Sequence, residues 1–274
     1  MIQDVRPVQV AVVQMNSTPD VEANLGVAEA LVREAARQDA ELIVLPEGFA
    51  CMSPDKEKTG VAESLEENGP ILSFCSDLAR AVGSELVLAG FPERGSVSGK
   101  TRNACVHLNR EGQILSVYRK IHLFDIQLDD GTSSRESEHT EAGEDVVVSP
   151  APFGGLGLSI CYDLRFPELY RRLVDKGAVA FAVPAAFLMT TGKHHWHVLL
   201  RARAIESQSY VLAAAQTGHH FGTRESYGHA LIADPWGSVL AECAEGEGVA
   251  VATVDPEVVS GIRRQLPSLQ HRKL

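Results

Sequence analysis

The sequence is poor in cysteine and has no long apolar run. Its 274 residues include 5 cysteines, an odd number without a Cys-x-x-Cys pair, which argues against a disulfide framework and favours a reducing compartment. No apolar run approaches the ~20 residues that a membrane-spanning helix needs. Residues 1–6 lack the basic and apolar segments of a signal peptide. We therefore predict a cytoplasmic protein without a membrane partner.

Basic residues are also scarce, with 25 Lys and Arg against 36 Asp and Glu and a net charge of −11. This balance argues against nucleic acid as a partner, because no excess of positive charge is present to neutralise phosphates. An anionic small molecule stays compatible with it, since a local group of Lys or Arg overrides the overall charge. Hydrophobic residues make up 45% of the chain and charged residues 22%, which is typical of a soluble globular protein with a sizeable core.

Short β-branched runs alternate with segments of helical periodicity along the chain. Predicted strands cover 8–15, 41–46, 85–89, 103–108, 114–118, 156–160, 179–183, 210–215, 228–233, 238–243 and 249–254, and predicted helices cover 20–37, 71–82, 167–176 and 195–207. Strands joined partly by helices and partly by hairpins imply a mixed sheet, or two sheets, flanked by helices. No low-complexity linker divides the chain, so we expect one domain over residues 1–274. The polar stretch 129–141 is either a solvated loop or an active-site loop.

Three side chains capable of chemistry follow predicted strands, where open α/β sheets tend to carry their sites. Glu47, after Leu-Pro, is either a proton-transfer group near apolar surroundings or a loop carboxylate that caps backbone. Lys120 is either a stabiliser of a developing oxyanion or a surface lysine at a strand end. Cys161 is either a nucleophile at a sharp break between strand and helix or a core residue. Together the three side chains form the minimum set for acyl transfer.

The segments around these residues resemble the nitrilase superfamily of carbon–nitrogen hydrolases. They read Leu-Pro-Glu-Gly-Phe around Glu47, Tyr-Arg-Lys-Ile-His-Leu-Phe-Asp around Lys120, and Cys-Tyr-Asp-Leu-Arg-Phe-Pro-Glu from Cys161. They occur in the family's order, and the resemblance covers nearly the whole chain. It implies an α/β fold, a four-layer α-β-β-α sandwich in which mixed sheets are flanked by helices. It also implies a homo-oligomer, a dimer or tetramer, formed through the helix after the nucleophile, and it implies no cofactor.

The resemblance further implies a role for each matching residue. Cys161 would attack the amide carbonyl as a thiolate, and Glu47 would take the thiol proton, pass it to the leaving amine and then activate water. Lys120 and the backbone N–H of Tyr162 would hold the oxyanion. Glu136, whose neighbours in the loop include Glu138 and Glu141, matches the family's second glutamate and would orient Lys120 or the substrate.

The C-terminal third resembles those members of the family that hydrolyse deaminated glutathione to 2-oxoglutarate and Cys-Gly. The segments concerned are Ser226-Tyr227-Gly228-His229-Ala230, Asp234-Pro235-Trp236-Gly237 and the Leu-Pro-x-x-Gln-His-Arg ending. An ω-amidase that acts on 2-oxoglutaramate or 2-oxosuccinamate is the alternative within the family. Both substrates are small anionic amides.

An anionic acyl group has two candidate receptors in the sequence. Arg165 lies four residues after Cys161, and its guanidinium either binds a substrate carboxylate or forms a structural ion pair with Glu168 or Asp163. Thr191 lies in Thr190-Thr191-Gly192, before the predicted helix 195–207, so its hydroxyl is a second candidate.

Two other kinds of protein are disfavoured. His194, His195, His197, His219 and His220 invite a metal site, but adjacent histidines project in different directions and no carboxylate has a familiar zinc spacing, so we expect no metal. A catalytically silent binding scaffold would be expected to lack Glu47, Lys120 or Cys161, and all three are present.

Overall fold

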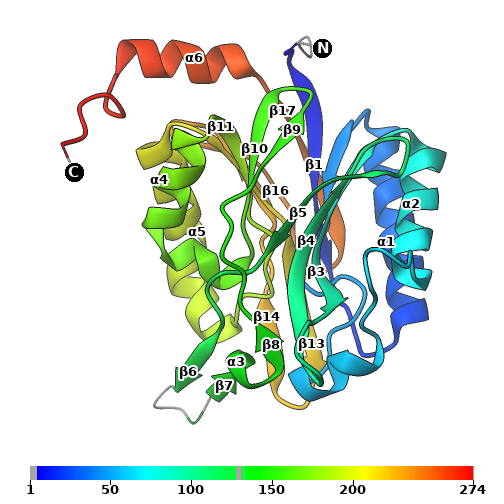
Figure 1. Ribbon diagram of the computed structural model, residues 1–274. Coiled ribbons are helices and arrows are strands. Elements are labelled where there is room, and N and C mark those ends of the chain that lie inside the picture. The colour runs from blue at the N-terminus through cyan, green and yellow to red at the C-terminus, as the bar shows by residue number, and fades with distance from the viewer. Residues whose placement is uncertain (1–4, 128–130, 132, 274) are drawn as a thin grey trace.

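The protein is a sandwich of two β-sheets with helices on both outer faces (Figure 1). The computed structural model describes residues 5–127, 131 and 133–273. Residues 1–4, which form most of the segment searched for a signal peptide, therefore lie outside the described residues. Mixed sheets flanked by helices confirm the predicted α-β-β-α fold class.

The first sheet combines parallel and antiparallel strands and contains the N-terminal strand near its centre. Its main path runs β14 (Arg224–Tyr227), β13 (Ala215–Phe221), β1 (Val8–Met15), β2 (Leu42–Val44), β3 (Glu85–Arg94), β4 (Thr101–Leu108) and β5 (Ile114–Arg119). In addition, β17 (Gly248–Val254) pairs antiparallel with β1, and β8 (Thr140–Glu141) pairs with β4. Because β4 is antiparallel to β3 and β5, the start of β4 lies at the same end of the sheet as the ends of β3 and β5.

The second sheet packs face to face on the first. Its order is β16 (Val239–Glu242), β15 (Leu231–Ala233), β12 (Tyr210–Ala213), β11 (Ala178–Ala182), β10 (Gly154–Leu158) and β9 (Val148–Ala151). A separate two-stranded ribbon of β6 (Asp125–Gln127) and β7 (Ser133–Arg135) lies at one end of the sandwich (Figure 1).

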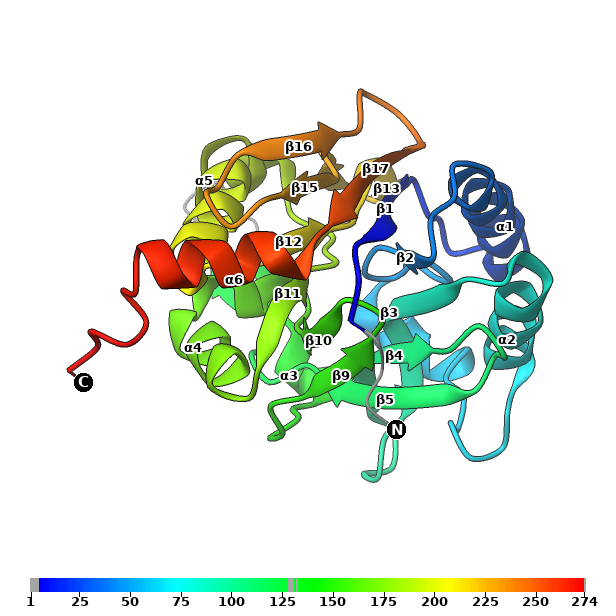
Figure 2. The same cartoon turned by 90° about the horizontal axis from the view of Figure 1, so that it is seen from above.

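Helices cover the outer face of each sheet. On the first sheet lie α1 (Val21–Arg37) and α2 (Pro70–Val82); on the second lie α4 (Pro167–Asp175) and α5 (Met189–Ser207). The side chain of Asp20 caps α1 by accepting from the N–H of Ala23, as its acceptor oxygen predicts. A further helix, α6 (Pro256–Gln265), extends across the end of the sandwich (Figure 2). No helix among the described residues is both long and apolar enough to span a bilayer.

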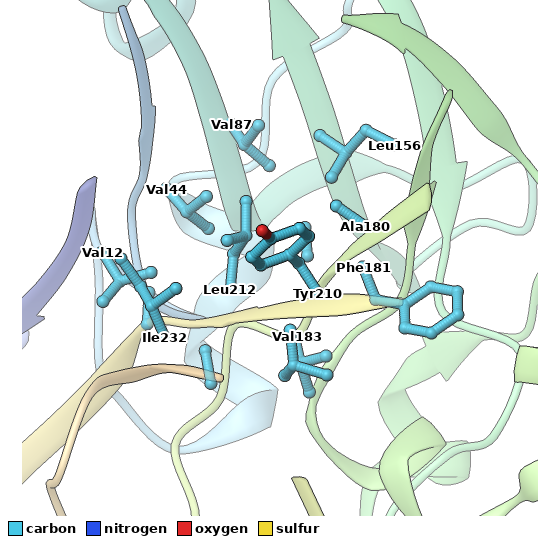
Figure 3. Packing of buried hydrophobic residues seen from close by; sticks show 14 of the residues in the cluster. Val12, Val44, Val87, Leu156, Ala180, Phe181, Val183, Tyr210, Leu212 and Ile232 are labelled. Atoms are coloured by element: carbon cyan, nitrogen blue, oxygen red, sulfur yellow. The ribbon is translucent and has the colours of Figure 1, made fainter. Parts of the chain in front are cut away.

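The main core lies between the sheets. Val12, Val44 and Val87 of the first sheet belong to the same buried cluster as Leu156 and Leu212 of the second (Figure 3). Burial of each such side chain stabilises the fold by roughly 1.5–3 kcal/mol. A second cluster joins the other face of the first sheet to α1 and α2. These two cores therefore hold the ends of the strands in fixed positions relative to one another.

Two predictions about elements were wrong, and other elements were missed. The strand expected over 210–215 is two strands, because the chain leaves the second sheet after Ala213 and enters the first at Ala215. The helix expected over 195–207 begins at Met189, so Thr191 belongs to its first turn instead of preceding it. The hairpin of β13 and β14 and the helix α6 were not predicted.

Candidate active site

A cavity of about 980 Å³ opens at the end of the sandwich where β2, β5 and β10 end. Glu47 after β2, Lys120 after β5 and Cys161 after β10 all line it. The described part of the polar stretch 129–141 also contributes to its wall through β7 and the short helix α3 (Glu136–His139). Asp129, Asp130 and Thr132 of that stretch lie outside the described residues.

A tight approach of two backbone segments positions Glu47. The N–H of Gly48 donates to the carbonyl of Ala89 at 3.1 Å. A Cβ atom added at Gly90 would lie 2.0 Å from the Gly48 nitrogen, and Gly90 also has φ +64; only glycine fits this position. The carboxylate is then held from the other side, because the N–H of Ala186 donates to Glu47 Oε2 at 3.0 Å.

Lys120 is buried between two carboxylates. Its Nζ atom lies 3.1 Å from Glu47 Oε1 and 2.8 Å from Glu136 Oε2. Glu136 is the first residue of α3, and its Oε2 atom also accepts from the N–H of Phe124 at 2.6 Å. The structure thus brings Glu136 to Lys120, whereas Glu141 of the same loop pairs with Arg102.

Cys161 occupies a strained turn between β10 and the short 3-10 helix η2 (Cys161–Arg165). Its φ is +47, a left-handed conformation that side chains other than glycine rarely adopt. The carboxylate of Asp163 fixes the turn, since it accepts from the N–H of Ile160 at 2.9 Å and from the hydroxyl of Tyr118 at 2.6 Å. Its other oxygen accepts from the N–H of His122 at 3.1 Å. This network holds Cys161 where it lines the cavity. The positive φ of a residue other than glycine is the kind of backbone strain found at active sites.

The electrostatics favour a neutral thiol beside a charged acid–lysine pair. Burial disfavours ionisation of Glu47, but the Lys120 ammonium, together with the hydrogen bond from Asn103, holds the pKa of Glu47 well below its ordinary value. Burial lowers the pKa of Lys120, yet the Glu136 and Glu47 carboxylates raise it well above normal. Burial, assisted by the Glu47 charge, raises the pKa of the Cys161 thiol. The resting site therefore holds a thiol, two carboxylates and an ammonium.

Sequence reasoning missed Asn103, which joins the two glutamates. Its Nδ2 atom donates to Glu47 Oε1 at 2.9 Å and to Glu136 Oε1 at 3.2 Å, and its backbone carbonyl accepts from the N–H of Lys120 at 2.9 Å. The only signal in the sequence was its position at the start of a predicted strand, which by itself does not distinguish it from other strand residues.

The three expected substrate-binding residues all line the cavity. The N–H of Tyr162 lies in the first turn of η2, where amide groups have no acceptor within the helix. The Arg165 guanidinium lies 4.9 Å from the Phe187 ring centroid and donates to His195 Nδ1 at 3.3 Å. Among the described residues it has no carboxylate partner, so the ion pair with Asp163 or Glu168 considered above does not form. Thr191, in the first turn of α5, lines the cavity as well.

One group of side chains has the composition of a metal site, but it lies elsewhere. His197, His229 and Glu242 each offer a ligand atom, and these atoms lie within 4.8 Å of one another. The two histidines both hydrogen-bond Glu242 Oε1, at 3.0 Å and 2.7 Å. None of the three lines the cavity, so the group does not belong to the reacting centre.

The comparison with known proteins gives concordant matches. A model of the carbon–nitrogen hydrolase family matches residues 9–264. A Synechocystis protein named deaminated glutathione amidase is 44% identical over 274 residues, which is 97% of this chain and 98% of its own. The human protein of that name is 45% identical over 271 residues, 96% of this chain and 82% of its own.

Solved structures agree with these matches. The Caenorhabditis elegans NitFhit protein superposes with a TM-score of 0.92 and 36% identity over 98% of this chain and 66% of its own. Saccharomyces cerevisiae Nit3, described as a member of branch 10 of the nitrilase superfamily, has a TM-score of 0.86 and 34% identity over 96% of this chain and 95% of its own.

Proposed function

The chain belongs to the carbon–nitrogen hydrolase family, and from that premise we propose that its cavity hydrolyses deaminated glutathione to 2-oxoglutarate and Cys-Gly. The observation that carries the proposal is the meeting of Cys161, Glu47, Lys120 and Glu136 in one cavity. The relatives named deaminated glutathione amidase, at 44% and 45% identity over nearly the whole chain, support the choice of substrate.

The first half of the reaction forms a thioester. Glu47 takes the proton of the Cys161 thiol, and the sulfur attacks the amide carbonyl carbon. The oxyanion that develops is held by Lys120 Nζ and by the N–H of Tyr162. Glu47, now protonated, gives that proton to the amide nitrogen, the C–N bond breaks, and Cys-Gly leaves.

The second half returns the enzyme to its resting state. Glu47 takes a proton from water, the hydroxide attacks the thioester carbon, and the same two donors hold the second oxyanion. The C–S bond then breaks, Cys161 regains a proton from Glu47, and 2-oxoglutarate leaves. Glu136 keeps Lys120 in place and in its charged form throughout, since it lies 2.8 Å from Nζ.

The acyl part of the substrate carries a 2-oxo acid carboxylate, for which Arg165 is the proposed partner. The guanidinium is stacked on the Phe187 ring and lines the cavity, so its donors are pre-oriented for a planar carboxylate. Thr191 lines the same side and supplies a hydroxyl.

An ω-amidase acting on 2-oxoglutaramate or 2-oxosuccinamate is the second candidate, because its acyl groups carry the same 2-oxo acid. The assay is to incubate the protein with deaminated glutathione or with 2-oxoglutaramate and to follow 2-oxoglutarate in both. Release of Cys-Gly far faster than release of ammonia supports the proposal, and the opposite ratio establishes the ω-amidase. A protein that hydrolyses neither is the silent scaffold.

We further propose a cytoplasmic homo-oligomer, a dimer or tetramer. All five cysteines are free, which supports a reducing compartment. The exposed apolar side chains that support association lie on α5 and on the neighbouring β15–β16 hairpin; they are Val198, Ile205, Trp236, Val239 and Leu240. Among the described residues, none of the exposed large apolar side chains lies on α4, the helix after the nucleophile. Size-exclusion chromatography with light scattering at micromolar concentration tests this, and a monomer alone would contradict it.

A further inference from the structure

The β13–β14 hairpin places a further arginine on the cavity wall, besides Arg102, Arg135 and Arg165. Arg224, the first residue of β14, is half-buried and lines the cavity. Its Nη2 atom donates to the carbonyl of Ala186 at 2.7 Å. Within the part of the chain that the structure describes, no carboxylate lies within ion-pair distance of it. Asp55 is close enough for Arg224 to contribute to lowering the pKa of that carboxyl, but Asp55 is paired with Lys58 at 2.7 Å.

Arg224 lies on the Glu47 side of the reacting centre. Ala186 joins the two residues, because its N–H donates to Glu47 Oε2 and its carbonyl accepts from Arg224. The leaving nitrogen must come within hydrogen-bond reach of Glu47, since Glu47 delivers its proton. The remainder of the leaving group therefore extends along the wall that Ala186 and Arg224 form. Arg165, by contrast, belongs to η2 with Tyr162, whose backbone N–H is one of the two proposed oxyanion donors.

Arg165 and Arg224 together match the two carboxylates of one candidate substrate. Deaminated glutathione has a carboxylate at each end, one on the 2-oxo acid and one on the glycine of the leaving group. 2-Oxoglutaramate has only the first, and its leaving group is ammonia. The reacting centre itself supplies two carboxylates against one ammonium, so a second substrate carboxylate needs a cation of its own outside that centre.

On this basis, which rests on the function proposed above, we propose that Arg224 binds the glycine carboxylate of the leaving dipeptide. The residue then determines specificity, because it discriminates dipeptide amides from simple ω-amides without touching the reacting atoms. An arginine held by one hydrogen bond to a fixed carbonyl retains donors for a paired contact with a carboxylate.

The experiment compares Arg224→Gln with the wild-type enzyme on three substrates. They are deaminated glutathione, its analogue in which the glycine carboxylate is an amide, and 2-oxoglutaramate. Gln retains an N–H for the Ala186 carbonyl but loses the charge. We expect kcat/KM for deaminated glutathione to fall roughly 10- to 100-fold, mostly through KM, because one charge-assisted contact is lost. The other two substrates should change less than about twofold, since they lack the carboxylate that Arg224 binds.

Two matched variants separate this role from others. Arg165→Gln should reduce kcat/KM for all three substrates alike, because all three share the 2-oxo acid. Arg135→Gln removes an exposed arginine of β7 that also lines the cavity, and it should change kcat/KM for no substrate by more than about threefold, because salt screens the attraction of an exposed charge for anions.

The outcomes are distinct. An equal fall on all three substrates for Arg224→Gln would mean that the residue only supports Ala186, and an unchanged KM for deaminated glutathione would mean that it binds nothing; either overturns the inference while the proposed function stands. A wild-type enzyme that hydrolyses 2-oxoglutaramate but not deaminated glutathione overturns both. Loss of activity confined to the substrate with a free glycine carboxylate establishes the role of Arg224.

Discussion

Replacing Lys120 by Gln tests whether its charge keeps two buried carboxylates ionised. In the wild-type protein the ammonium lies 3.1 Å from Glu47 and 2.8 Å from Glu136. Asn103 contacts an oxygen of each glutamate, so the two carboxylates stay close when the lysine is gone. Removing one partner from a buried ion pair costs roughly 3–5 kcal/mol. We expect Lys120→Gln to lose that amount of unfolding free energy at pH 8.

The loss of unfolding free energy in Lys120→Gln should depend on pH, in a direction that follows from the pKa of Glu47. In the wild-type protein the pKa of Glu47 lies below its ordinary value. Its ionisation thus contributes stability above the pKa of the unfolded chain, which is lost as the pH falls through the folded pKa. Without Lys120, burial and the like charge of Glu136 raise the pKa of Glu47 above the unfolded value. The variant is then stabilised by a proton as the pH falls, so its deficit should shrink between pH 8 and pH 5.

Urea unfolding followed by far-UV circular dichroism at the two pH values measures this deficit. Lys100→Gln is the matched control, because Lys100 Nζ donates to the Ser137 carbonyl at 2.7 Å, a neutral acceptor. Its effect on unfolding free energy should be the same at both pH values. A Lys120→Gln deficit that is equally independent of pH would refute the coupling of the lysine to the two carboxylates.

Three further substitutions probe other parts of the site. Cys161→Ala should lower turnover roughly 10⁴-fold or more with little change in melting temperature, and retained activity would disprove the nucleophile. Asn103→Ala should lower kcat roughly 10- to 100-fold through misplacement of the two glutamates; steady-state kinetics that match the wild type would exclude this positioning role. Gly90→Ala should lower the melting temperature more than Gly83→Ala, since both have φ near +65 but only the first added Cβ meets backbone. Equal melting temperatures would contradict the account of that contact.

Much of the architecture was readable from the sequence because the relevant signals are local. The apolar runs that became β1, β2 and β10 are visible in the sequence itself, and Pro46 marks the end of the second run. Such runs lead into Glu47, Lys120 and Cys161. Their position at one end of the sandwich could therefore be expected from sheet topology and from the family resemblance. Glu136 required the resemblance alone, as nothing local separates it from Glu138.

What escaped prediction depends on contacts between distant segments. Ala213, Ala214 and Ala215 read as one continuous strand because periodicity does not show which sheet a residue joins. Asn103 and Arg224 acquire their roles only when a distant segment of the chain, carrying Glu47 or Ala186, is placed beside them. The pairing of His197, on α5, with Glu242, on β16, is invisible for the same reason.

The passage of the chain from one sheet to the other at Ala214 has a consequence for how such an enzyme diversifies. The N–H of Gln216, just beyond the crossing, donates to the carbonyl of Ala185 at 2.8 Å, so the two sheets are joined next to the residue that holds Glu47 and Arg224. The acid is thus held at the point where the two sheets are joined. The tip of the hairpin that begins at the crossing, residues 221–225, lines the same cavity. A mutation at this tip therefore alters the cavity wall without replacing a residue that reacts.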